Sequence, residues 1–111
     1  MAVLTVNSVT RSGLNLTATL TAAGNSGDSW AGTGQEILAV ANGSESSITV
    51  TLAYQRTFDG ATPSNKTVSV AAGKTLLIGP FPQILYNDAS QRVNVTYSSA
   101  SSVTVAVFRL G

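Results

Sequence analysis

Apolar and polar residues alternate along two runs of this chain, residues 46–54 (SSITVTLAY) and residues 101–108 (SSVTVAVF). Because successive side chains of a β-strand point to opposite faces, a period of two predicts strands with one buried face. The polar positions are mostly threonine, whose branched side chain favours the extended conformation. No long segment shows the period of an amphipathic helix together with capping residues. The pattern therefore predicts an all-β protein.

The same alternation continues through the rest of the chain and predicts eight strands. They are expected at residues 3–9, 14–20, 36–42, 47–54, 67–70, 74–79, 92–97 and 102–108. Segment 37–41 is almost continuously apolar, so we expect it to be buried on both faces. Four residues in the middle of apolar faces are predicted core residues: Val50, Leu52, Val95 and Val105. Eight short strands separated by turn residues predict a two-sheet β-sandwich of the jelly-roll type.

The chain has 111 residues, which suits a single sandwich domain over 1–111 with residues 1–12 as a candidate N-terminal arm. Asn42-Gly43 between two apolar runs is typical of a hairpin turn. Two connections, 21–35 and 55–66, are longer than a sandwich requires, and long loops often carry function.

The long connections contain three candidate partner-contact residues: Trp30 in the first, and Arg56 and Phe58 in the second. Tryptophan, other aromatic residues and arginine are enriched at protein interfaces. The alternative for Trp30 is a lid that completes the core at one end of the sandwich.

Composition argues against most kinds of chemistry. The chain has no histidine and no cysteine, and only 10% of its residues are charged, with a net charge of +1. Metal thiolate sites, disulfides and histidine-based catalysis are therefore absent from the sequence. The basic residues are scattered, which gives no electrostatic reason to expect nucleic acid or a membrane as a partner. A surface with so little charge favours an assembled state.

The remaining motifs are better explained by structure than by chemistry. Gly73-Lys74-Thr75 ends like a phosphate-binding loop but lacks the earlier glycine and the following helix. The acidic residues lie singly in the sequence, and the acidic turns at Asn87-Asp88 and Asp59-Gly60 are ordinary turn chemistry. We expect no catalytic residue, no metal and no cofactor, and hence not an enzyme.

Several segments along nearly the full length of the chain carry a family resemblance. The resemblance is carried by the order and texture of several segments. These are Thr33-Gly34, Ile37-Leu-Ala-Val-Ala-Asn-Gly-Ser44, the Ser-Ile-Thr-Val-Thr strand, Val68-Ser-Val-Ala-Ala-Gly73, Ile78-Gly-Pro-Phe81, Tyr86-Asn-Asp88, Val95-Thr-Tyr97 and a Thr-Val-Ala-Val ending. In these segments the chain resembles small proteins of tailed bacteriophages that are often encoded beside the major capsid protein, namely head decoration, or cement, proteins of the small all-β type.

The resemblance implies a non-enzymatic structural protein that binds the outside of a phage capsid and stabilises the shell. The implied partner is the major capsid protein, the implied assembly is a homo-oligomer with a trimer favoured, and the implied location is the virion. The N-terminus carries no signal peptide, so we expect synthesis in the host cytoplasm. The alternative function is a carbohydrate- or receptor-binding module of a phage tail or fibre.

Overall fold

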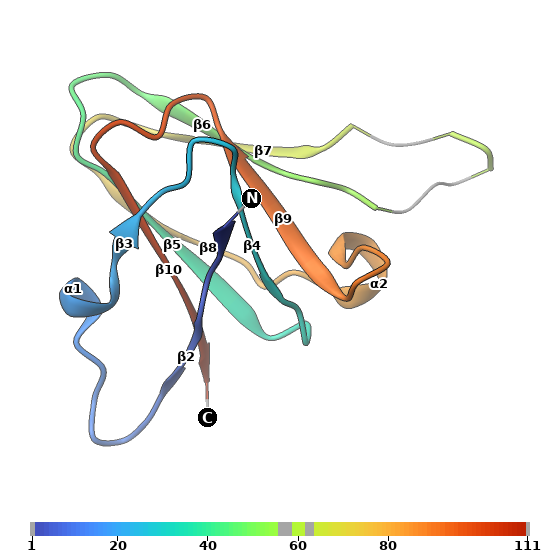
Figure 1. The fold of residues 1–111 in the computed structure, drawn as a ribbon, viewed down its shortest axis with the longest axis horizontal. Helices are drawn as coiled ribbons and strands as arrows, with labels where there is room; N and C mark the ends of the chain where they lie inside the picture. Colours follow the sequence, from blue (N-terminus) through green and yellow to red (C-terminus); the bar gives the residue numbers. More distant parts are fainter. Residues whose placement is uncertain (1, 56–58, 62–63, 111) are drawn as a thin grey trace.

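The computed structural model describes residues 2–55, 59–61 and 64–110, which form ten strands and two short helices (Figure 1). The strands are β1 (Ala2–Val3), β2 (Val6–Val9), β3 (Thr21–Ala22), β4 (Asp28–Ala31), β5 (Glu36–Asn42), β6 (Ile48–Leu52), β7 (Lys66–Val70), β8 (Thr75–Ile78), β9 (Arg92–Tyr97) and β10 (Val103–Leu110). The helices are α1 (Leu16–Thr19) and α2 (Gln83–Tyr86). Among the described residues nearly all regular structure is strand and the two helices have four residues each, so the all-β class is confirmed.

The strands form two packed sheets. Sheet A has the order β1-β4-β9-β6-β7, and sheet B has the order β2-β10-β5-β8, with β3 also pairing with β10. From β3 to β10, every connection except the β6–β7 hairpin passes from one sheet to the other. This alternation interleaves two Greek keys and is the strand order of a jelly roll. The two-sheet, jelly-roll-like sandwich is therefore confirmed.

The N-terminal segment belongs to both sheets. The strand expected at residues 3–9 is divided: β1 pairs in parallel with β4, and β2 pairs in parallel with β10. Between them Leu4 turns into the core, where it is only 9% exposed, and its N–H donates to the carbonyl of Ser29 at 2.7 Å. Residues 2–9 therefore form an edge of each sheet.

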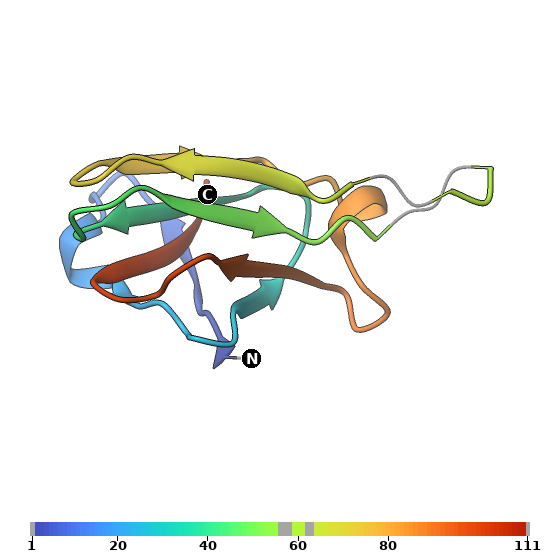
Figure 2. The same ribbon diagram turned by 90° about the horizontal axis from the view of Figure 1, so that it is seen from above.

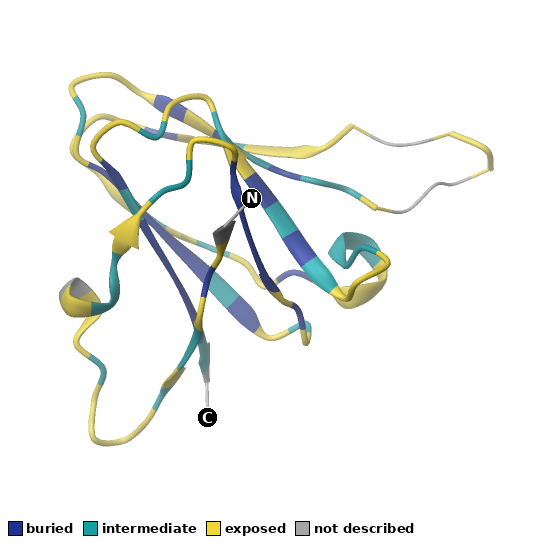
Figure 3. Cartoon of the chain, viewed as in Figure 1, coloured by how far each residue is buried: buried dark blue, intermediate teal, exposed yellow. Residues whose placement is uncertain are grey.

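The core lies between the sheets, where the predicted alternation places it. Val50, Leu52, Val95 and Val105 are fully buried, which confirms the predicted strand registers. Figure 3 shows the buried residues concentrated along the strands, while the connections are exposed. In β5, Leu38, Ala39 and Val40 are all buried, so the expectation of burial on both faces holds for the middle of this strand.

The strand expected at residues 14–20 is wrong, because residues 16–19 form the helical turn α1. The side-chain oxygen of Asn15 accepts a hydrogen bond from the N–H of Ala18 at 3.2 Å, which caps this turn. Leu14 and Leu20 pack against a small apolar cluster that contains Phe108. The leucines are spaced as in a strand but cover a sheet rather than join one.

The sequence also missed β4, which lies within the connection expected at residues 21–35. Asp28–Ala31 pairs with β9 on one side and with β1 on the other, and Asp28, Ser29 and Trp30 are buried. Two consecutive polar residues, Asp28 and Ser29, begin this short strand and interrupt the alternation of polar and apolar residues. Flanking glycines made the segment look like a loop.

The hairpin expected at Asn42-Gly43 is a crossover, since β5 lies in sheet B and β6 in sheet A. Asn42 is buried and holds the crossover together. Its side-chain N–H donates to the carbonyls of Ser46 and Val70, and its oxygen accepts from Ser44. The backbone carbonyl of Asn42 accepts from the N–H of Gly73, whose φ of +73° suits a tight turn between β7 and β8. A single asparagine therefore links two neighbouring crossovers.

Candidate functional site

Trp30 lies in β4 and points into the core, where it is 0% exposed. Its ring contacts Phe81 at a centroid distance of 5.6 Å, and its indole N–H has no hydrogen-bond partner among the described residues. This placement matches the alternative of a residue that completes the core. A side chain without exposed area offers nothing to a partner in the folded single chain, so we do not carry Trp30 forward as a contact residue.

Arg56 and Phe58, the other two candidate contact residues, lie outside the described residues. They belong to the connection between β6 and β7. The described turn of this connection has Asp59 and Gly60 at φ values of 52° and 80°, as the Asp-Gly sequence predicts for a tight hairpin turn. In Figures 1 and 2 this turn lies beyond the end of the two sheets.

An aromatic row runs from the core to the surface at the same end of the sandwich. Trp30 contacts Phe81, Phe81 contacts Tyr86, and Tyr86 contacts Tyr54, the last two pairs at centroid distances of 5.5 Å. Tyr54 and Tyr86 are half-buried, and burial together with the neighbouring Tyr54 raises the pKa of Tyr86. This row could not be predicted from the sequence, because its members lie on four different segments.

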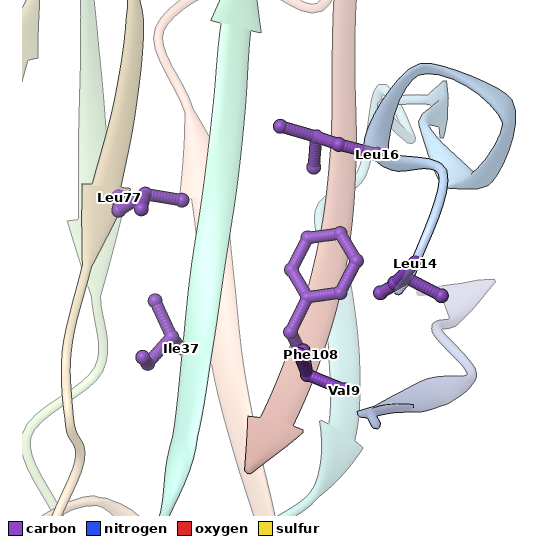
Figure 4. A pocket seen from close by; sticks show the side chains of 6 residues that line it. All are labelled: Val9, Leu14, Leu16, Ile37, Leu77 and Phe108. Carbon is purple, nitrogen blue, oxygen red and sulfur yellow. The ribbon is translucent and has the colours of Figure 1, made fainter. Parts of the chain in front are cut away.

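The second candidate surface is an apolar groove on the outer face of sheet B (Figure 4). Its volume is about 280 Å³, and it is lined by Val9, Leu14, Leu16, Ile37, Leu77 and Phe108. Figure 4 shows Ile37 and Leu77 on one side of the groove and the leucines of the α1 segment with Phe108 on the other. None of the lining residues is charged. Leu77 is 66% exposed, the highest value among the large apolar residues of this face.

The groove follows from the sequence of the central strands. On the outer face, Ile37 lies opposite Phe108 and Ala39 lies opposite Ala106, so apolar residues occupy both faces of β5 and β10. A sheet with two apolar faces needs a second covering layer. The segment that carries Leu14 and Leu20 covers the β10 side of this face. The side formed by β5 and β8 has no such cover among the described residues.

Two buried carboxylates serve the backbone of nearby turns. Asp28 accepts from the hydroxyl of Tyr97 at 2.7 Å and from the N–H of Gly24 at 3.1 Å. Burial, and then the hydrogen bond to Asp28, raise the pKa of Tyr97 far above its ordinary value. Glu36 accepts from the N–H and the hydroxyl of Thr33. Each carboxylate accepts hydrogen bonds from neighbouring residues of the fold, and we assign both a structural role.

The acidic turn at Asp88 is likewise a backbone cap. Its carboxylate accepts from the side chain of Asn94 and from the N–H groups of Arg92 and Ser90, at distances between 2.8 and 3.1 Å. The bond from Asn94, followed by that from Arg92, lowers the pKa of Asp88. Across the described ranges, no three acidic side chains come close enough together to hold a metal ion.

No protein-family model, curated protein or solved structure matches this chain. Within the described ranges, α1 and α2 have four residues each, and no helix is long and apolar enough to cross a membrane. The apolar groove and the aromatic row are therefore the two surfaces on which a functional proposal can rest.

Proposed function

We propose that this chain is a non-enzymatic structural protein that binds the outside of a tailed-phage capsid and stabilises the assembled shell. The proposal rests on the sequence resemblance to small all-β decoration proteins, and the apolar groove on sheet B is the structural observation that supports it. Exposed apolar surface rimmed by polar residues is typical of protein–protein contacts. A groove without charged residues suits a protein partner better than nucleic acid or an anionic surface.

Stabilisation requires only differential binding. A protein that binds the assembled shell and not its separated subunits stabilises the shell by mass action. Many copies on one lattice add their effects without any chemical step. In this proposal an apolar segment of the capsid protein enters the groove between Leu16 and Ile37.

The test uses purified shells that lack the protein. Wild-type protein is expected to co-sediment with the shells and to raise the temperature at which they disrupt. Leu16→Asp places a charge in the groove and is expected to weaken binding at least tenfold, because burying an unpaired carboxylate is costly. Leu16 is 40% exposed, so this variant should still fold, which circular dichroism checks.

Ile84→Asp is the matched control. Ile84 lies in α2, is 66% exposed and does not line the groove, so its variant should bind as the wild type does. The proposal fails if wild-type protein neither binds the shells nor raises their heat resistance. The role of the groove fails if Leu16→Asp and Ile84→Asp bind equally well.

The aromatic row favours a second function, a carbohydrate- or receptor-binding module of a phage tail or fibre. Tyr54 and Tyr86 lie partly exposed at the end of the sandwich, and aromatic rings with polar tips are common in binding sites. In that case a glycan array should yield a specific ligand. Its binding should be lost in Tyr86→Ala and kept in Leu16→Asp.

A further inference from the structure

Among the described residues, strand β8 (Thr75–Ile78) is an open edge of sheet B. It pairs with β5 on one side and ends the strand order of the sheet on the other. An unpaired edge presents a row of backbone N–H and C=O groups, for which the complementary partner is another strand. No charged residue lies within β8, and Lys74 stands immediately before it.

The register shows which backbone groups of β8 face the open side. The carbonyl of Lys74 accepts from the N–H of Asn42 at 2.9 Å, so residue 74 directs its backbone toward β5. Backbone direction alternates along an antiparallel pair. Residues 76 and 78 therefore also bond toward β5, and Thr75 and Leu77 direct their N–H and C=O groups away from the sheet.

The side chains of the same two residues are exposed. Thr75 and Leu77 both lie on the outer face of sheet B, opposite Ala41 and Ala39 of β5. Leu77 is 66% exposed although it belongs to a packed sheet. An edge with unpaired backbone groups therefore coincides with a large exposed apolar side chain.

We propose that β8 pairs in antiparallel fashion with β8 of a second copy of this chain, about a two-fold axis at Leu76. In this register Thr75 of each copy lies opposite Leu77 of the other. The N–H and C=O groups that Thr75 and Leu77 direct away from sheet B then form hydrogen bonds with those of the other copy. The two sheets B become one continuous sheet, and their outer faces stay on the same side.

A second copy fits this edge because the pairing is self-complementary. In this register odd-numbered residues pair with odd-numbered residues, so side chains on the outer face of one copy lie beside side chains on the outer face of the other. The two copies of Leu77 then become diagonal neighbours within reach of each other. The two copies of Lys74 stand four residues apart along the ladder, roughly 13 Å from the rise of a strand. Salt screens charges beyond roughly 8 Å under physiological conditions, so their repulsion is small.

The other open edge, β7 (Lys66–Val70), is less suited to this pairing. It begins with a lysine, and charged residues on an edge strand oppose strand addition. Thr67 and Ser69 are polar and exposed on the outer face, where β8 carries Leu77.

The expected association is weak in solution. A four-residue strand buries much less than the roughly 800 Å² per partner of a stable interface. We expect a monomer–dimer equilibrium that shifts with protein concentration. This two-fold contact differs from the trimer that the sequence resemblance favours, because a three-fold ring needs two different surfaces on each copy.

The first experiment measures mass against concentration by analytical ultracentrifugation. Wild-type protein is expected to approach the dimer mass at high concentration. Leu77→Asp should remain a monomer, because two carboxylates would be brought together at the edge. Ile84→Asp introduces the same charge at a site with the same 66% exposure and should dimerise normally. A wild-type monomer at every concentration, or an unaffected Leu77→Asp, overturns the proposal.

The second experiment tests the register and does not depend on Leu77→Asp folding. The chain has no cysteine, so single cysteines can be introduced cleanly. Hydrogen-bonded antiparallel pairs have Cα atoms about 5.5 Å apart, which suits a disulfide. An equal mixture of Thr75→Cys and Leu77→Cys should cross-link at least fivefold faster than either variant alone, with Ile84→Cys as the background. Equal rates overturn the proposed pairing.

Neither experiment requires a capsid, so its failure leaves the proposed function untouched. The proposed function survives if the wild type binds shells yet stays a monomer at every concentration. That result would overturn the second copy as the occupant.

Discussion

Trp30 combines the largest buried side chain of this protein with a position in a short strand near the sheet edge. Its ring touches Phe81, which follows the corner after β8, and so it connects sheet A to the segment that leads into α2. The residue therefore contributes to stability rather than to recognition.

Replacing Trp30 by alanine is expected to reduce the free energy of unfolding by about 3–5 kcal/mol, since a large aromatic side chain leaves a cavity that neighbours fill only partly. Trp30→Phe keeps most of the contact and should cost clearly less. Urea denaturation followed by circular dichroism measures both. Unchanged midpoints in the alanine variant would mean that the side chain is not in the core.

Tyr97 makes the free energy of unfolding depend on pH in the alkaline range. Its pKa is raised in the folded state above the ordinary value of 10.0 by burial and by Asp28, so the folded protein holds this proton more tightly than the unfolded chain. The resulting stabilisation is complete below about pH 10 and is lost as the pH rises from there toward the folded-state pKa. The pKa of Tyr86 is also raised, which acts in the same direction.

We therefore expect the unfolding free energy of the wild type to fall above about pH 10, and Tyr97→Phe to flatten this fall. At neutral pH the same variant should be less stable by about 1–3 kcal/mol, because it removes a hydrogen bond to the buried carboxylate of Asp28. Denaturation curves at several pH values test both statements. If the unfolding free energy of Tyr97→Phe falls with alkaline pH as steeply as that of the wild type, groups other than Tyr97 cause the pH dependence.

At the scale of elements, the strands that pair within strongly alternating runs were predictable. Segment 92–97 matches β9 because alternation and burial coincide there, and segment 36–42 matches β5 because its continuous apolar run is buried. The segment 14–20 failed because a helical turn capped by Asn15 and a strand can both place leucines on one side of a short stretch. β4 failed because its partners, β1 and β9, lie far away in the sequence, and pairing outweighs local propensity.

The site was less predictable than the fold for the same reason. The groove joins residues of β2, the α1 segment, β5, β8 and β10, and no local pattern brings these together. One signal was present: the almost continuous apolar run in 37–41 implies that the outer face of β5 needs a cover. Only the structure shows that the segment with Leu14 and Leu20 covers the β10 side of this face and leaves the β5 and β8 side open.

Asn15 tests whether the α1 turn is held by its cap. Asn15→Ala should lower the free energy of unfolding by about 0.5–2 kcal/mol, because the N–H of Ala18 loses its acceptor. Asn15→Ser retains an acceptor and should lie close to the wild type. Thermal unfolding distinguishes the two variants. Equal stability of all three proteins would mean that leucine packing alone holds the segment in place.

For the molecule as a whole, the two long sides of the sandwich differ. On one side the N-terminal segment adds β1 to sheet A and β2 to sheet B, and Leu4 fills the space between them. On the other side β7 and β8 end their sheets. A low net charge of +1 gives little repulsion between copies. Association through the side formed by β7 and β8 is therefore the arrangement that this distribution of edges favours.

The parallel pairing of β2 with β10 also governs how the chain reaches its fold. Val6 of β2 pairs with Val107 of β10, so β2 finds its partner only after β10 has been synthesised. Until then the backbone N–H and C=O groups of β2 form hydrogen bonds with water, and the residues synthesised before β10 cannot complete sheet B. Contacts of such high sequence separation slow folding. The nascent protein therefore has to remain unaggregated until β10 has been made.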